Sequence, residues 1–201
     1  MLTASVAALL AGCGGSAKTS TPVPAAPPPS SSAASPAPPA GASALQAEAT
    51  SAAAGDIPDN QVFLTFRDPA AGYSMKYPEG WAQSGSGSSV TFRDKNNIVR
   101  VVVTSAPPPT VTSINGELSS LAGARVKSGP EPLTISGAPA FKAVYTTESA
   151  PNAVTGRRVT LVVDRYYLFR GGKESVVDLG TPKGVDNVDA YRLMIESFRW
   201  R

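Results

Sequence analysis

Residues 157–180, RRVTLVVDRYYLFRGGKESVVDLG, hold two runs of β-branched and aromatic residues on either side of Gly171-Gly172. Runs of this composition predict β-strands, here over 157–170 and 174–180. Two adjacent glycines suit a two-residue type I′ turn, because both central residues of that turn need a positive φ. The stretch therefore predicts an antiparallel hairpin with Arg165 opposite Asp178, a pair that contributes at most about 1 kcal/mol when it is exposed.

Similar runs elsewhere predict the rest of a β-sheet. Val101-Val102-Val103 and Leu161-Val162-Val163 are apolar without alternation, which is typical of strands buried on both faces. A sheet with two buried faces needs a covering layer on each of them. The other predicted strands are 61–67, 73–77, 89–93, 98–105 and 140–147.

Two amphipathic helices can supply these layers. The first is predicted over 113–124 with Ser113 as its N-cap, and the second over 187–198 with Asp186 as its N-cap. Their apolar faces are Ile114, Leu118, Leu121 and Ala122 in the first helix and Val188, Tyr191, Ile195 and Phe198 in the second. The order of elements predicts an α+β fold, an α/β/α sandwich around an antiparallel sheet of about six or seven strands with helices on both faces.

Motifs near both ends of this region point to a known family. They are FRDP at 66–69, GYSMKYPEGW at 72–81, DRYY at 164–167, VVDL at 176–179 and ESFR at 196–199. Together they resemble PsbP-like domains, in which a strand that ends in Tyr-Pro-x-Gly-Trp leads into the sheet. The resemblance covers most of 57–201 and implies an α/β/α sandwich that docks or assembles and does not catalyse. The family includes an extrinsic subunit of the photosynthetic oxygen-evolving complex and bacterial lipoproteins of unassigned role.

The motif residues also have a purely structural interpretation. Tyr73, Tyr77 and Trp81 are most simply core aromatics, which favours packing over ligand contact. Pro78 and Gly80 are turn residues. Ser197 and Phe198 end the last predicted helix with a buried ring.

The composition excludes several kinds of catalytic site. The chain has 201 residues with no histidine and one cysteine, so it has no imidazole base or ligand and no internal disulfide. Residues 57–201 contain 17 basic and 13 acidic residues, a net charge of +4 that is too small to indicate nucleic-acid binding. No paired carboxylates, calcium loop or Ser-x-x-Lys motif is evident, and 84–89 is interpreted as a flexible turn and not a phosphate loop. The sequence therefore predicts no catalytic residue, metal site or cofactor.

The amino terminus is typical of an export signal. Residues 2–11 form an apolar run about half as long as a membrane-spanning helix, which predicts a signal peptide over 1–12. No Lys or Arg precedes Leu2, which departs from the usual signal pattern and leaves the true start open. The run ends in Leu10, Ala11, Gly12 and Cys13, which resembles the bacterial lipobox. That resemblance implies a diacylglyceryl thioether on Cys13, cleavage before it, and acylation of the new amino terminus with a fatty acid such as palmitate.

Residues 13–56 are predicted to be a disordered tether. From 14 to 56, 37 of 43 residues are Ala, Pro, Ser, Gly or Thr, a composition that cannot bury enough apolar surface to fold. A flexible coil of this length spans roughly 35 Å. The lipidated protein would thus hold its globular domain, 57–201, on the extracytoplasmic side of a bacterial cell membrane.

Basic residues gather around the hairpin at Arg157, Arg158, Arg165, Arg170 and Lys173. They could dock on an acidic partner or on anionic lipid headgroups, although a solvated sheet edge that resists aggregation is the favoured alternative. The predicted function is a non-catalytic, monomeric lipoprotein that assists a membrane protein complex. The competing hypothesis is a surface lipoprotein that captures a small molecule or a metal ion in a pocket of the sandwich.

Overall fold

The computed structural model describes residues 54–152 and 156–201. The predicted signal peptide, the lipobox with Cys13, and nearly all of the predicted tether lie outside the described residues. The structural description therefore concerns the globular domain.

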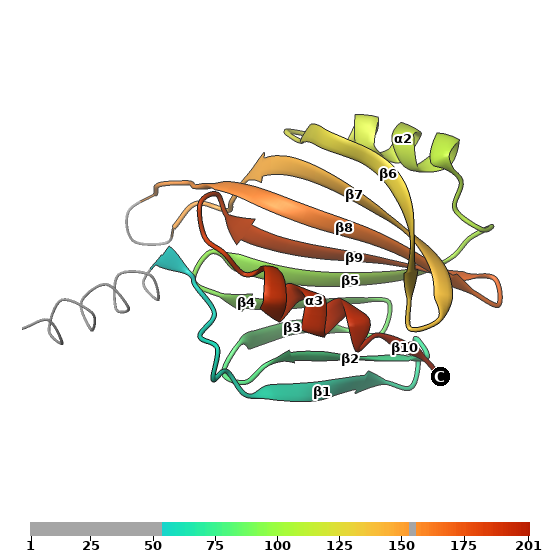
Figure 1. Cartoon of the computed structure of the whole chain (residues 1–201), viewed down its shortest axis with the longest axis horizontal. Helices are drawn as coiled ribbons and strands as arrows, with labels where there is room; N and C mark the ends of the chain where they lie inside the picture. The colour runs from blue at the N-terminus through green and yellow to red at the C-terminus, as the bar shows by residue number, and fades with distance from the viewer. Residues whose placement is uncertain (1–53, 153–155) are drawn as a thin grey trace, which may run out of the picture. The chain divides into compact units, whose positions relative to one another are not determined.

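The domain contains two antiparallel sheets (Figure 1). The larger has seven strands in the order β3-β4-β5-β9-β8-β7-β6, and the smaller has three in the order β1-β2-β10. The large sheet consists of β3 (Ala82–Ser86), β4 (Ser89–Asp94), β5 (Asn97–Ser105), β6 (Arg125–Ile135), β7 (Ala138–Glu148), β8 (Thr160–Arg170) and β9 (Lys173–Pro182). The small sheet consists of β1 (Phe63–Asp68), β2 (Tyr73–Pro78) and β10 (Arg199–Trp200), and the helices are α2 (Val111–Ser120) and α3 (Val188–Glu196).

The two helices cover opposite faces of the large sheet, as predicted. Ile114 and Leu118 of α2 pack on one face, in a cluster that includes Tyr145, Val163 and Tyr167. On the other face, α3 contributes to a larger cluster that also holds the inner residues of the small sheet. The buried residues of α3 are Tyr191, Met194 and Ile195. The expected α/β/α arrangement around an antiparallel sheet is confirmed.

The hairpin predicted from Gly171-Gly172 is also confirmed. The two glycines have φ angles of 58° and 76°, and Arg165 pairs with Asp178 across β8 and β9. Strand β8 begins at Thr160, so the predicted start at Arg157 is three residues too early.

Three strands were not predicted, namely β3, β6 and the two-residue β10. All five residues of β3 are exposed, and β6 contains Pro130, Pro132 and two shifts of register. The segment 84–89, predicted to be a flexible turn, instead closes the hairpin of β3 and β4, with Ser86 paired to Ser89. The sequence of β3 and β6 gave no strand signal because most of their side chains are exposed, and apolar residues alternate with polar ones only where one face of a strand is buried.

Both helices begin at positions other than those predicted. Thr110 caps α2, and Ser113 is the third helical residue of a reciprocal capping box. The N-cap of α3 is Asn187, while Asp186 accepts a hydrogen bond from the Val188 amide at 3.2 Å. Val188, predicted on the apolar face, is 68% exposed.

Candidate docking surface

Most residues of the family motif are packed in the core cluster to which the small sheet, the large sheet and α3 all contribute. The Tyr73 ring is fully buried and stacks on Phe198 with 5.5 Å between ring centroids. Tyr77 stacks on Phe92 at 4.3 Å, and Trp81 is 8% exposed. The Ser197 hydroxyl accepts a hydrogen bond from the Lys76 amide at 2.7 Å. These contacts fit the structural interpretation of the motif.

The five basic residues of the predicted docking set do not form one surface. Arg157 and Arg158 precede β8, whereas Arg170 and Lys173 flank the turn at the opposite end of the hairpin. Arg165 lies between these ends and is 4% exposed, so it does not face a partner. The predicted set is therefore divided, and Arg165 has a different role.

Arg165 is the centre of an ion triad in which Arg165 and Asp178 are buried and Glu117 is partly exposed. Its Nε and Nη2 donate to the two carboxylate oxygens of Asp178 at 2.6 and 2.8 Å. Its Nη1 donates to Glu117 of α2 at 2.7 Å, and its guanidinium lies over the Tyr145 ring at 5.3 Å from the centroid. The pair predicted to contribute little as an exposed contact is instead a buried fork-to-fork pair that also joins α2 to the sheet.

Burial shapes the titration of the groups around the triad. Burial alone would lower the pKa of Arg165, but the hydrogen bonds and charge of Asp178 outweigh it and raise that pKa. Burial raises the pKa of Tyr145 to about 12, and the charge of Asp178 adds to this shift. Burial, followed by the charge of Glu117, raises the pKa of Glu174. Arg165 thus stays cationic beside a neutral phenol.

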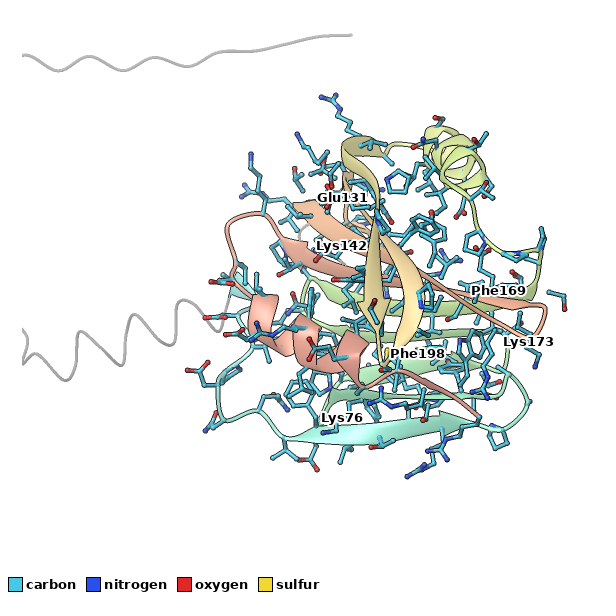
Figure 2. The ribbon with its side chains drawn as sticks, turned by 45° about the vertical axis from the view of Figure 1, so that its right-hand side comes forward. Lys76, Glu131, Lys142, Phe169, Lys173 and Phe198 are labelled. Carbon is cyan, nitrogen blue, oxygen red and sulfur yellow. The ribbon has the colours of Figure 1, made fainter. Side chains whose placement is uncertain are left out.

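The tip of the hairpin meets the carboxyl-terminal segment of the chain. Arg170 donates from Nη1 to the Trp200 carbonyl at 3.4 Å, and Lys173 donates to the Ala71 carbonyl at 3.1 Å. Figure 2 shows Lys173 near the outer end of the hairpin, not far from Phe169. Trp200, 30 positions from Arg170, and Ala71, 102 positions from Lys173, thus lie beside the tip of the hairpin.

Three further arginines lie around Ser74 of the small sheet. Arg67 of β1 and Arg199 of β10 both pair with Ser74, so their side chains leave the sheet on the same face as the serine. Arg201 donates from Nε to the Ser74 hydroxyl at 3.1 Å. Arg67, Arg199 and Arg201 are exposed.

We call the surface formed by Arg67, Arg170, Lys173, Arg199 and Arg201 the basic end. None of the ion pairs found within residues 54–152 and 156–201 includes any of these five cations. The sequence interpretation missed three of them because they come from segments far apart in the chain. The alternation Arg199-Trp200-Arg201 was the one local sequence pattern that indicated a basic surface at this end of the domain.

A groove of about 740 Å³ lies between the segment that enters β1 and the start of α3. Its lining includes four aspartates, Asp56, Asp59, Asp186 and Asp189, and it is open to solvent. By contrast, Tyr73, Phe92 and other large side chains fill the space between the sheets and α3.

The described part of the chain contains no group of three His, Cys, Asp or Glu side chains placed to hold a metal ion. Neither α2 nor α3 has the length and hydropathy of a membrane span, and no other helix in that part does. Cys13 lies outside it.

Comparisons with known proteins agree with the fold. A family model described as PsbP matches residues 61–125. The solution structure of cyanobacterial PsbP (CyanoP) from Synechocystis sp. PCC 6803 is similar with a TM-score of 0.51 and 17% identity, over 73% of this chain and 98% of that one. Weaker similarity is found to the Saccharomyces cerevisiae Ran-binding protein Mog1p, with a TM-score of 0.46, 8% identity, and coverage of 70% of this chain and 96% of that one. LpqN, involved in cell envelope biogenesis of Mycobacterium tuberculosis, has a TM-score of 0.37, 15% identity, and coverage of 70% and 84%. No curated protein has a significantly similar sequence.

Proposed function

We propose that this PsbP-like domain is the non-catalytic docking module of a lipid-anchored bacterial protein, held outside the cytoplasm and bound through the basic end to an acidic face of a membrane protein complex. The lipid anchor is Cys13, and the tether that follows it gives the domain its reach. The observation that carries the proposal is the basic end, where three separate segments of the chain bring five cations together. None of these cations forms an ion pair with an acidic residue of the described chain.

The chemistry of the basic end fits a carboxylate-rich protein surface. Four of its five cations are arginines, whose planar guanidinium groups bind carboxylates through two parallel hydrogen bonds. Half-buried Trp200 lies among them, and Trp and Arg are enriched at protein interfaces. Clustered charge also speeds the encounter with a partner of opposite charge.

The position of the basic end favours a protein over lipid headgroups. The described chain begins on the side of the domain away from the hairpin tip and the carboxyl terminus (Figure 1). A surface that lies away from the point where the tether joins suits a partner that projects from the membrane. The role as a non-catalytic module is supported by the absence of histidine and by the paired or capping roles of the carboxylates around α2 and α3.

The anchor is tested by fatty-acid labelling in intact bacteria. Wild-type protein should incorporate an alkyne analogue of palmitate and sediment with membranes, and Cys13→Ser should lose the label completely, because only the thiolate forms the thioether. Ser16→Ala, in the same stretch, should keep the label. Labelling that persists in Cys13→Ser would refute the anchor.

The docking surface is tested by chemical crosslinking in native membranes. Arg67→Glu combined with Arg170→Glu should reduce crosslinks to a membrane protein by about tenfold, because two attractive charges become repulsive. The matched control reverses two exposed cations of β6, Arg125→Glu and Lys127→Glu, and should leave the yield unchanged. Crosslinks to lipid alone, or an equal loss in the control, would contradict protein docking through the basic end.

A further inference from the structure

The groove beside the start of α3 has rigid walls. The Asn187 side chain, 3% exposed, accepts a hydrogen bond from the Ile57 amide at 2.8 Å and donates to the Gly55 carbonyl at 3.1 Å. Asn97 donates to the same carbonyl at 2.5 Å. These bonds fix residues 55–57 against the domain, so one wall of the groove is held in place at the point where the chain enters the fold.

Apolar residues make up about half of the groove lining. Phe63, Ala190 and Leu193 line it together with Ile57 and Pro58. Of the six large hydrophobic side chains exposed in the described chain, four lie in β1, just before it, or in α3, and one of these, Leu193, lines the groove itself. They are Val62 (56% exposed), Leu64 (39%), Val188 (68%) and Leu193 (38%). Exposed apolar side chains gathered beside a polar rim indicate a protein interaction site.

The rim of the groove is acidic. Asp56, Asp59, Asp186 and Asp189 line it, and no Lys or Arg of the described chain does. Asp189 pairs with exposed Arg192 at 2.6 Å, whereas no ion pair within the described ranges includes the other three carboxylates. No three of these carboxylates are placed to hold a metal ion. The negative charge of the groove therefore favours an extended, positively charged ligand.

We infer that this groove binds a segment of a partner protein in which lysine or arginine residues flank an apolar side chain. The apolar side chain contacts Phe63 and Leu193, and the cations face Asp56, Asp59 and Asp186. The inference is independent of the proposed docking through the basic end, because the groove is formed by other segments and carries the opposite charge. The domain would thus hold two partners, or two parts of one partner, through surfaces of opposite sign.

Photo-crosslinking in intact cells tests this inference on the full-length chain. A photoreactive residue at position 193 should capture a protein segment whose sequence has Lys or Arg around an apolar residue. The matched control places the same residue at position 126, where Val126 of β6 is 47% exposed, and should give at least about fivefold less of that product. Capture of lipid, of residues 1–53 of this chain or of a second copy, or equal capture from both positions, would overturn the inference.

Binding of a defined probe tests the charge requirement. The probe is a synthetic peptide of repeated Lys-Leu-Leu-Lys units, with Glu-Leu-Leu-Glu as the negative counterpart. At low salt, Asp59→Asn with Asp186→Asn should weaken binding of the cationic peptide by about tenfold. Asn at 186 keeps a side-chain oxygen for the Val188 amide, so the start of α3 is preserved.

Two control variants complete the test. Glu131→Gln neutralises a carboxylate on β6 (Figure 2), away from the groove, and should leave the affinity within about twofold of wild type. Arg67→Glu with Arg170→Glu should not weaken peptide binding, so failure of the groove and failure of the basic end are separable. Equal weakening by Glu131→Gln, or no weakening by the aspartate variant, would refute the groove as the binding site.

Discussion

Arg165→Met should lower the free energy of unfolding by about 3–5 kcal/mol, because it leaves a buried carboxylate without its partner. Asp178 is 6% exposed and both of its oxygens accept hydrogen bonds from Arg165. Glu117, with a side chain 40% exposed, can turn to water and contributes less to the loss. Equilibrium urea unfolding, followed by tryptophan fluorescence, measures the change.

A double variant separates the unpaired charge from lost packing. Arg165→Met with Asp178→Leu should recover most of the stability, because both buried charges are replaced by apolar groups of similar size. Arg192→Met is the control, since Arg192 and Asp189 form an exposed pair with side chains 63% and 85% exposed. It should change stability by no more than about 0.5 kcal/mol. A loss in Arg165→Met as small as that in the control would show that the Arg165–Asp178 pair is not buried in solution.

Phe198→Ala should destabilise the fold by about 3–5 kcal/mol, which is typical of removing a buried aromatic ring. Phe198 is 1% exposed, stacks on Tyr73 and meets Trp200 edge-on at 5.3 Å. Its ring therefore joins the end of α3 to the small sheet. The truncation removes these ring contacts and leaves a cavity between elements that depend on them.

Urea unfolding combined with amide hydrogen exchange measures the effect of Phe198→Ala. Beyond the global loss, protection should fall most at β2 and β10, because Tyr73 and Trp200 lose their packing partner. Val188→Ala is the matched control on α3, since its side chain is 68% exposed, and it should change stability by no more than about 0.5 kcal/mol. Equal losses for the two variants would contradict the packing of Phe198.

The sequence predicted the hairpin register but not the environment of its central pair. Gly171-Gly172 requires a turn with positive φ, and that turn fixes Arg165 opposite Asp178. Whether the pair is buried depends on α2, which supplies Glu117 from 48 positions earlier. Cross-strand pairing rules contain no information about which stretch of a sheet a helix covers.

The basic end could not be predicted from local pattern for a related reason. Arg67, Arg170 and Arg199 belong to three segments that meet only when β10 pairs with β2 and the hairpin tip contacts Trp200. β10 has two residues, too few to produce a periodic signal. Patterns within one segment predicted the main elements, whereas surfaces assembled from several segments required the tertiary structure.

The two free edges of the seven-stranded sheet bear on how copies of this domain behave at high concentration. β6 interrupts its ladder at two points and carries Pro130 and Pro132, and five-residue β3 turns at Gly85 with a φ of 78°. Prolines, bulges and short strands make poor templates for pairing with a neighbouring sheet. Copies of the domain that meet edge to edge are therefore not expected to pair into a continuous β-sheet.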